Sequence, residues 1–348
     1  MLIEGLHVPL ALPFYRDGQS YLRKLEHNVA RYSLTPASAL VALAPGGEAS
    51  SLSDAETAEA LRAIGAAAAK EKVLVAGIER DSVHGALALA EQAAAAHFDA
   101  VLLASPRNVE TLRRESGVEA ILLFFSAVAD ASPLPVMLWK DAGLSLDAVA
   151  SLSRHPNVIG MYDPALTLES LAAAAEATRD VQREVTVTTV FTPVTGRMLV
   201  QEHEGAATFV SADALGGGAA VAVAPPRSAV KTRTKVVGFQ IVGAGNAAGM
   251  LSLLQAGAAG VMPPLATCAP QGCHEVLAAF KDGDPALAAE KAVRLEAADA
   301  LMQELGVAGL KYGCDLNGYF GGHPRLPRLP LTAERRLRVD AALKELRN

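Results

Sequence analysis

Short apolar runs alternate with longer amphipathic stretches along most of this chain, and such an alternation predicts repeated strand–helix units. The short runs are mostly apolar without interruption, which is typical of parallel strands that are buried on both faces. We expect helices between these strands, for example over residues 21–33 and 168–178. The first six predicted strands occupy residues 7–14, 39–43, 73–78, 100–104, 135–138 and 158–161.

The alternation stops at about residue 181 and resumes near residue 234. The intervening residues are rich in Thr, Val and Gly and include Gly216-Gly217-Gly218 and Pro225-Pro226, so they predict short strands or ordered loop instead of a helix. We interpret them as an insertion between the sixth helix and the seventh strand. A helix-to-strand connection lies at the N-terminal face of a barrel, so the insertion is expected to lie away from the pocket.

Two more strands, at residues 236–242 and 260–262, bring the number of strand–helix units to eight. Eight such units predict an α/β fold of the (β/α)8 TIM-barrel type. We therefore assign residues 1–282 to the barrel, with the insertion at about 181–234, and residues 283–348 to a C-terminal helical extension. The extra C-terminal helices are expected at 285–305 and 333–346.

The composition narrows the functional classes. Among 348 residues the formal net charge is −6, so no basic surface is expected that would neutralise the phosphates of a nucleic acid. No apolar run approaches the roughly 20 residues that a membrane span needs. Three cysteines and the lack of a leader before the first apolar segment predict a reduced, cytoplasmic protein.

Two motifs that suggest bound groups are weak. Cys268, Cys273 and His274 do not have the spacing of the common zinc pairs, and we expect these cysteines to pack between helices. Gly243 and Gly245 follow a predicted strand, but residue 248 is alanine, so the dinucleotide-binding pattern is incomplete. No cofactor is predicted.

Several short motifs occur in an order that resembles the dihydrodipicolinate synthase / N-acetylneuraminate lyase family of Schiff-base aldolases. The resemblance implies a barrel enzyme of the lyase class, a small carboxylate or keto acid as ligand, and a homo-oligomer, either a dimer or a tetramer. The motifs are Leu12-Pro13-Phe14 with Asp17-Gly18, Gly47-Glu48, Val75-Ala76-Gly77, Leu134-Pro135-Val136, Asn157-Val158-Ile159-Gly160, Ala256-Gly257-Ala258-Ala259-Gly260-Val261 and Gly321-Gly322-His323-Pro324-Arg325-Leu326-Pro327.

The catalytic positions that the resemblance implies carry other residues. The imine-forming lysine of the family corresponds to Tyr162, and the proton-relay tyrosine of strand five corresponds to Trp139. Pro45 and Gly46 replace the hydroxyl residues before the Gly-Glu motif, and Arg107 falls near the position of a further tyrosine. Because a phenol supplies no primary amine, the chain is expected to be a divergent member that lacks the Schiff-base lysine.

Lys140 and Tyr162 are the candidate catalytic residues. Lys140 follows Trp139 at the end of the neighbouring strand, where a desolvated lysine could act as a nucleophile. The alternative is a solvated Lys140 that pairs with Asp141, which the alternation along the strand favours. The residues predicted to bind substrate are Gly46, Gly47, Arg107, Trp139 and Gly243.

Glu48, Glu79, Asp141 and Asp163 all fall near predicted strand ends, where a ring of carboxylates could hold a divalent cation. Their spacing matches no established metal motif, so we expect ordinary polar roles and no metal. Two functional hypotheses remain open. The first is a divergent lyase that acts on a small keto or hydroxy acid by a non-standard mechanism. The second is an inactive family member that binds a small carboxylate or serves as a structural or regulatory partner.

Overall fold

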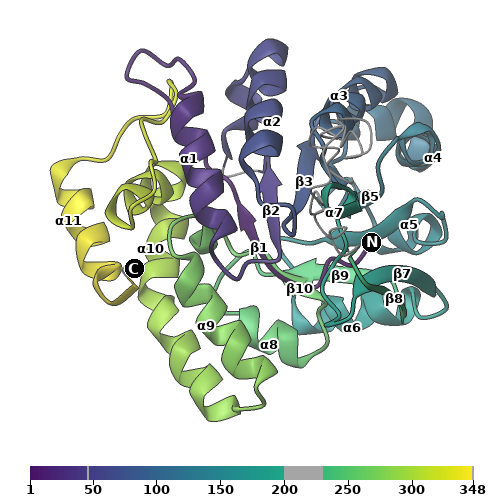
Figure 1. Ribbon diagram of the computed structural model, residues 1–348. Helices are drawn as coiled ribbons and strands as arrows, with labels where there is room; N and C mark the ends of the chain where they lie inside the picture. Colours follow the sequence, from purple (N-terminus) through teal and green to yellow (C-terminus); the bar gives the residue numbers. More distant parts are fainter. Residues whose placement is uncertain (45–46, 200–229, 347–348) are drawn as a thin grey trace, which may run out of the picture.

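The computed structural model describes residues 1–44, 47–199 and 230–346. Within these residues, eight parallel strands close into a barrel in the order β1-β2-β3-β4-β5-β6-β9-β10, and helices cover its outside (Figure 1). The predicted (β/α)8 fold is therefore confirmed. The strands are β1 (Gly5–Pro9), β2 (Ala39–Ala42), β3 (Val73–Ile78), β4 (Ala100–Leu103), β5 (Val136–Trp139), β6 (Val158–Tyr162), β9 (Gln240–Gly243) and β10 (Gly260–Val261).

Some helices of the barrel begin where the sequence provides side-chain caps. Ser53 and Glu56 form the reciprocal capping box that starts α2, and the Ser82 hydroxyl accepts a hydrogen bond from the Gly85 amide at the start of α3. Thr167 starts α6 in a similar way with Ser170. The helices are α1 (Leu22–Ser33), α2 (Asp54–Ala67), α3 (Val83–Ala95), α4 (Val109–Ala131), α5 (Leu146–Leu152), α6 (Leu168–Ala177), α8 (Met250–Gln255) and α9 (Pro270–Lys281).

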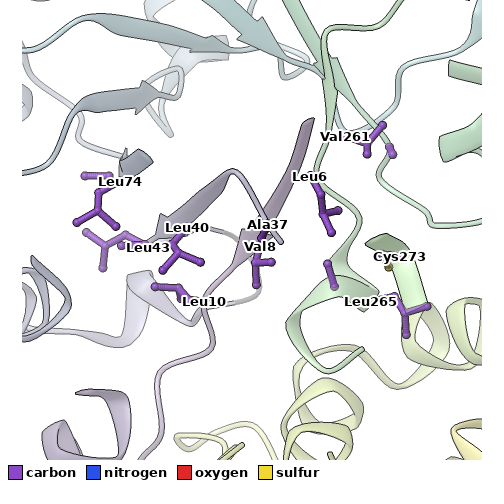
Figure 2. Packing of buried hydrophobic residues seen from close by; sticks show 14 of the residues in the cluster. Leu6, Val8, Leu10, Ala37, Leu40, Leu43, Leu74, Val261, Leu265 and Cys273 are labelled. Carbon is purple, nitrogen blue, oxygen red and sulfur yellow. The ribbon is translucent and has the colours of Figure 1, made fainter. Parts of the chain in front are cut away.

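Alternate residues of each strand divide the core into two layers. The outward-facing residues pack against the helices, and Figure 2 shows Leu6 and Val8 of β1 and Leu40 of β2 in this layer. The inward-facing residues form a separate apolar cluster that fills the barrel. It contains Ile3, Ala39, Val41, Ala44, Val73, Val75, Ala100, Leu102, Met137, Ile159, Tyr162, Val242 and Met262, with Met1 and Trp139 packed against it. The barrel is a packed core and not a pore.

Between α6 and β9 the chain forms an antiparallel pair of strands, β7 (Arg183–Thr188) and β8 (Thr232–Val237), and a short helix α7 (Gly196–Leu199). Val185, Val187 and Val237 of this pair are buried with Leu2. Hydrogen bonds from Arg183 to the carbonyl oxygens of Ser153 and His155 join it to the connection before β6. The inserted hairpin thus lies at the N-terminal face of the barrel.

Two strand boundaries differ clearly from the prediction. Val236 and Val237 belong to the hairpin, and the seventh barrel strand begins only at Gln240. The apolar run from Val236 to Val242 looks like one strand in the sequence, but its first residues pair with β7 and its last residues pair with β6. β1 ends at Pro9, although the buried run continues to Phe14. Apolar residues indicate that a segment is buried, whereas a strand also requires a neighbouring strand with which its backbone forms hydrogen bonds.

The C-terminal extension contains α10 (Pro285–Leu316) and α11 (Ala333–Ala342). The sequence predicts that α10 ends near residue 305, but it continues past a kink at Gly306, whose φ is 59°. A glycine tolerates this conformation, so helical residues on both sides can remain packed. No helix among the described residues is long and apolar enough to cross a membrane.

Candidate functional site

Tyr162 lies at the carboxyl end of β6, in register with Trp139 at the end of β5. The two rings meet edge to face, with centroids 6.2 Å apart and planes at 70°. Both belong to the apolar cluster inside the barrel, and Tyr162 is only 4% exposed. The two sequence-predicted residues are therefore brought together at the end of the barrel where parallel-strand enzymes place their reactive groups.

Burial raises the pKa of the Tyr162 phenol above its usual value, and the neighbouring Asp163 carboxylate raises it further. The phenol consequently stays protonated at neutral pH. A protonated phenol donates a hydrogen bond but is neither a base nor a nucleophile. Tyr162 is suited to polarising a carbonyl group and unsuited to forming a covalent bond with it.

Lys140 pairs with Asp163 and not with Asp141. Its Nζ lies 3.4 Å from Asp163 Oδ2, and its backbone amide donates to the Tyr162 carbonyl at 2.8 Å. Trp139 and Tyr162 point inward, so Lys140 and Asp163, which follow them, lie on the outward side of the strand ends. The Asp163 side chain is 3% exposed and that of Lys140 is 26% exposed. A half-buried ammonium is thus held beside Tyr162 by a buried carboxylate.

The four acidic residues considered as a metal ring bind separate partners. Glu48 pairs with Lys311, Glu79 with Arg107, and Asp163 with Lys140. Asp141 accepts hydrogen bonds from the Ser105 hydroxyl at 2.8 Å and from the Gly143 amide at 2.8 Å, and so joins the loops after β4 and β5. In the described part of the chain no cluster of three or more His, Cys, Asp or Glu could hold a metal ion.

Arg107 lies in the loop after β4, where its Nε is 3.3 Å from Glu79 Oε1 at the end of β3. Its backbone amide donates to Asp81 at 2.8 Å, and the side chain is 53% exposed. This places the guanidinium over the β3–β4 side of the barrel end, two strands away from Tyr162. The arginine is accessible to a ligand, but Glu79 partly neutralises its charge.

The predicted glycines have tight surroundings. A Cβ on Gly47 would lie 2.8 Å from the Leu10 carbonyl oxygen, so the loop after β2 packs closely on the segment after β1. A Cβ on Gly243 would lie 2.4 Å from the Leu166 side chain, which indicates that this glycine packs against the outer layer. Gly46 and Pro45 lie outside the described residues.

Sequence reasoning missed a buried ion pair close to this loop. Lys311 of α10 contacts Glu48, and both side chains are almost fully buried. Lys311 Nζ also donates to the His323 carbonyl at 2.8 Å, and the Arg325 amide donates to Glu48 Oε1 at 2.9 Å. Desolvation lowers the pKa of Lys311, and Glu48 opposes this shift. The pair fastens the C-terminal segment to the loop after β2.

The aromatic ring of Phe14 completes this buried cluster. Lys311 Nζ lies 4.4 Å from the ring centroid, and the Arg325 guanidinium lies 4.3 Å from it. Phe14 and Arg325 are about 300 positions apart in the chain, so no local pattern predicts their contact. The motifs around the two residues are the only signal in the sequence that points to it. The cluster supports the carboxyl end of the barrel from outside.

Comparisons with known proteins agree with this architecture. The family model described as "Dihydrodipicolinate synthetase family" matches residues 2–188 and 222–346. The chain is 24% identical over 352 residues to a 4-hydroxy-tetrahydrodipicolinate synthase of Acidiphilium cryptum, covering 99% of both proteins. It is 30% identical over 169 residues to a protein of Emericella nidulans named "Probable 4-hydroxy-2-oxoglutarate aldolase, mitochondrial", and this match spans 46% of the chain and 54% of that protein.

Among solved structures, the fold is similar to that of dihydrodipicolinate synthase DapA-2 from Bacillus anthracis. The TM-score is 0.76 at 20% sequence identity, and the match covers 100% of both chains. At this identity the similarity concerns the fold alone.

Proposed function

The chain belongs to the dihydrodipicolinate synthetase family, and from this premise we propose that it is a divergent lyase that acts on a small keto or hydroxy acid without forming an imine at the end of β6. The family and the names of its curated relatives support a lyase. The observation that carries the proposal is the protonated, buried phenol of Tyr162 at the carboxyl end of β6, where the resemblance predicts the family's imine lysine.

In the proposed mechanism Tyr162 donates a hydrogen bond to the keto oxygen of the substrate. When the carbon–carbon bond of a hydroxy keto acid breaks, its electron pair passes to that oxygen as an enolate, while the hydroxyl of the departing fragment loses its proton to water and becomes a carbonyl. Before a carbon–oxygen bond breaks, a proton next to the keto group passes to water and leaves the same enolate. The enolate then expels hydroxide, which takes up that proton and leaves as water. A donor already in place stabilises the enolate in both cases. Lys140, held 3.4 Å from Asp163, adds a positive charge at the neighbouring strand end. Lys140 thus acts in this proposal by its charge and its proton and not as a nucleophile.

We assign substrate binding to the groups around these two residues. Trp139 would provide an apolar wall beside Tyr162. Arg107 is the accessible cation for an acidic group of the substrate. The Gly47 amide already donates to the Ala44 carbonyl at 2.8 Å, so Gly47 would shape the loop and not bind the carboxylate itself, and Gly46 stays a prediction from the sequence. Gly243, whose missing side chain would face Leu166 in the outer layer, could contribute only its backbone on the β9 side.

A second candidate function is binding without turnover. It is favoured by the apolar character of the barrel interior, where Tyr162, Trp139 and Met262 cluster beside the expected site. A site with few polar side chains can hold a small carboxylate and still lack the groups that move protons during a reaction.

Borohydride trapping with pyruvate, read by mass spectrometry, tests the proposal. We expect no adduct on the natural chain and a covalent adduct on residue 162 in the Tyr162→Lys variant, because that change returns an amine to a site that still binds the keto acid. An adduct on Lys140 of the natural chain would contradict the mechanism. Failure to turn over a panel of keto acids that nevertheless raise the melting temperature would support binding alone.

The homo-oligomeric state, either dimer or tetramer, and the cytoplasmic location stay predictions. The oligomer can be measured directly by light scattering on the purified chain. Tyr162 and Lys140 come from neighbouring strands of one chain, so variants at the proposed site can be tested before the oligomeric state is known.

A further inference from the structure

A cavity lies at the opposite end of the barrel from Tyr162. It has a volume of about 670 Å³ and is bounded by the connection before β6, the end of α6 and the first inserted strand β7. Its walls include Arg154, Asn157, Thr178, Arg183 and Gln240. This volume is in the range of about 300–1,000 Å³ that small-molecule sites occupy.

Arg183 is held rigidly in the wall of this cavity. Its Nη2 donates to the Ser153 carbonyl at 2.5 Å and to the His155 carbonyl at 2.8 Å. Its Nε is buried without a hydrogen-bond partner, and among the described residues its Nη1 has none either. Two carbonyl bonds fix the plane of the guanidinium and leave other N–H groups available, as an anion-binding arginine requires.

No carboxylate balances this charge within the described part of the chain. Asp180 and Glu184 also line the cavity, but Asp180 pairs with Arg179, at 3.7 Å, and neither pairs with Arg183. Burial lowers the pKa of the Arg183 guanidinium, as expected when a cation loses water and gains no counter-ion. A half-buried arginine without an acidic partner is unfavourable unless an anion compensates it.

The other polar groups of the cavity indicate where a ligand would bind. The Asn157 amide nitrogen already donates to three carbonyl groups, and the Gln240 amide nitrogen donates to Met1 and Ile159. These two side chains therefore close the floor. Arg154 is exposed, and its one hydrogen bond in the described residues goes to the Ala150 carbonyl of the preceding helix α5, at 3.3 Å. The two arginines are the side-chain cations that line the cavity.

We propose that this N-terminal cavity binds a small organic anion through Arg183 and Arg154. The ligand carries a carboxylate or a phosphate group, because both offer the paired oxygens that a guanidinium recognises. Arg183 comes from the inserted hairpin and Arg154 from the loop before β6, so the ligand would bridge the insertion and the barrel. The site is separate from the substrate site and does not rest on the proposed lyase activity.

Calorimetric titration of the full chain with inorganic phosphate, succinate and citrate tests this site. At low ionic strength we expect saturable binding of at least one probe, weakened at least tenfold in Arg183→Gln and by less than twofold in Arg338→Gln. Arg338 is the matched control, because it is exposed, pairs with Glu304, and does not line the cavity. Phosphate alone binding would assign a phosphorylated ligand, and succinate or citrate alone a carboxylate.

The absence of saturable binding of all three probes, or an unchanged affinity in Arg183→Gln, would overturn the proposal. If Arg183→Gln fails to fold, Arg154→Gln takes its place, because that exposed side chain contributes little to packing. Binding should then weaken at least threefold, and an equal affinity would count against the site. Hydrogen exchange gives a second readout, since the bound anion should slow exchange in peptides that cover residues 183–188.

Discussion

Tyr162 and Trp139 occupy paired positions on β6 and β5, with ring centroids 6.2 Å apart. The resemblance to the family predicts an amine and a hydroxyl at these two positions. Here they form one edge-to-face aromatic pair inside the barrel, and the amine nearest to it along the chain, Lys140, is engaged by Asp163. On that prediction, the chain has a hydrogen-bond donor next to a fixed charge pair where the family has a nucleophile.

Replacing Tyr162 by phenylalanine removes the hydroxyl and keeps the ring, so it measures the contribution of the hydroxyl alone. We expect catalytic efficiency, or ligand affinity if no turnover is found, to fall at least tenfold, because losing one donor to a developing oxyanion costs about 2.7–4 kcal/mol. The melting temperature should change little, since the ring stays against Trp139. Tyr15→Phe, at a residue 44% exposed, is the control. An unchanged affinity and rate would remove Tyr162 from the site.

The Lys140–Asp163 pair predicts that two substitutions of Lys140 will differ in their effects on activity and stability. Lys140→Met removes the positive charge and leaves the buried Asp163 without its partner, so we expect both slower turnover and lower stability. Lys140→Arg keeps the charge and should recover most of the activity. Steady-state kinetics and thermal denaturation of the two variants measure this. Activity that depends on the amine itself, with Lys140→Arg as inactive as Lys140→Met, would instead indicate covalent chemistry.

Changing one residue of the Lys311–Glu48 pair should destabilise the protein far more than replacing both residues together. Glu48→Gln leaves a buried ammonium unpaired, so the free energy of unfolding measured in urea should fall by about 3–5 kcal/mol. Glu48→Gln combined with Lys311→Met should cost less than the sum of the two single changes, because they share one interaction. Glu304→Gln breaks an exposed pair with Arg338 and should have no measurable effect. Strict additivity at Glu48 and Lys311 would contradict the buried pairing.

His7 predicts an acid-sensitive fold. It is fully buried in β1, and desolvation lowers its pKa from 6.5 to about 4, although its bond to the Ile3 carbonyl opposes the shift. The unfolded chain protonates this residue first, so stability is complete above pH 6.5 and is lost as the pH falls towards 4. The full difference is on the order of 3 kcal/mol. Urea midpoints measured from pH 7 to pH 4 should decline less steeply in His7→Gln, and parallel curves would exclude His7 as a cause.

Asp99 holds the inserted hairpin against the barrel. Its carboxylate accepts hydrogen bonds from the Leu74 and Gly196 amides, both at 2.9 Å, and lies 3.6 Å from Arg197. Asp99→Ala removes all three contacts, so we expect faster hydrogen exchange in peptides covering residues 183–199. Exchange in β1 and β10, on the other side of the barrel, should not change. Uniform acceleration over the whole chain would indicate global destabilisation instead of local release.

Much of the fold follows from residue patterns that act over short distances. Uninterrupted apolar runs identify buried parallel strands, and Ser53 with Glu56 identifies the start of a helix, because strand burial and helix capping depend on neighbours in sequence. The same patterns misplace the seventh strand and the end of α10, since the end of a hydrogen-bonded ladder and a kink at Gly306 depend on what packs against the segment.

The sequence by itself determined the barrel and its insertion, because both depend on which residue follows which. That Tyr162 stands where the family carries its imine lysine stays a prediction from the sequence. Only the tertiary structure decided that Lys140 pairs with Asp163, that Glu48 binds Lys311, and that Arg183 lines a cavity without a counter-ion. Side-chain partners at such positions come from segments that are far apart in the chain. These partners determine the charge and the burial of each side chain at a site, and the neighbouring residues in the sequence do not identify the partners.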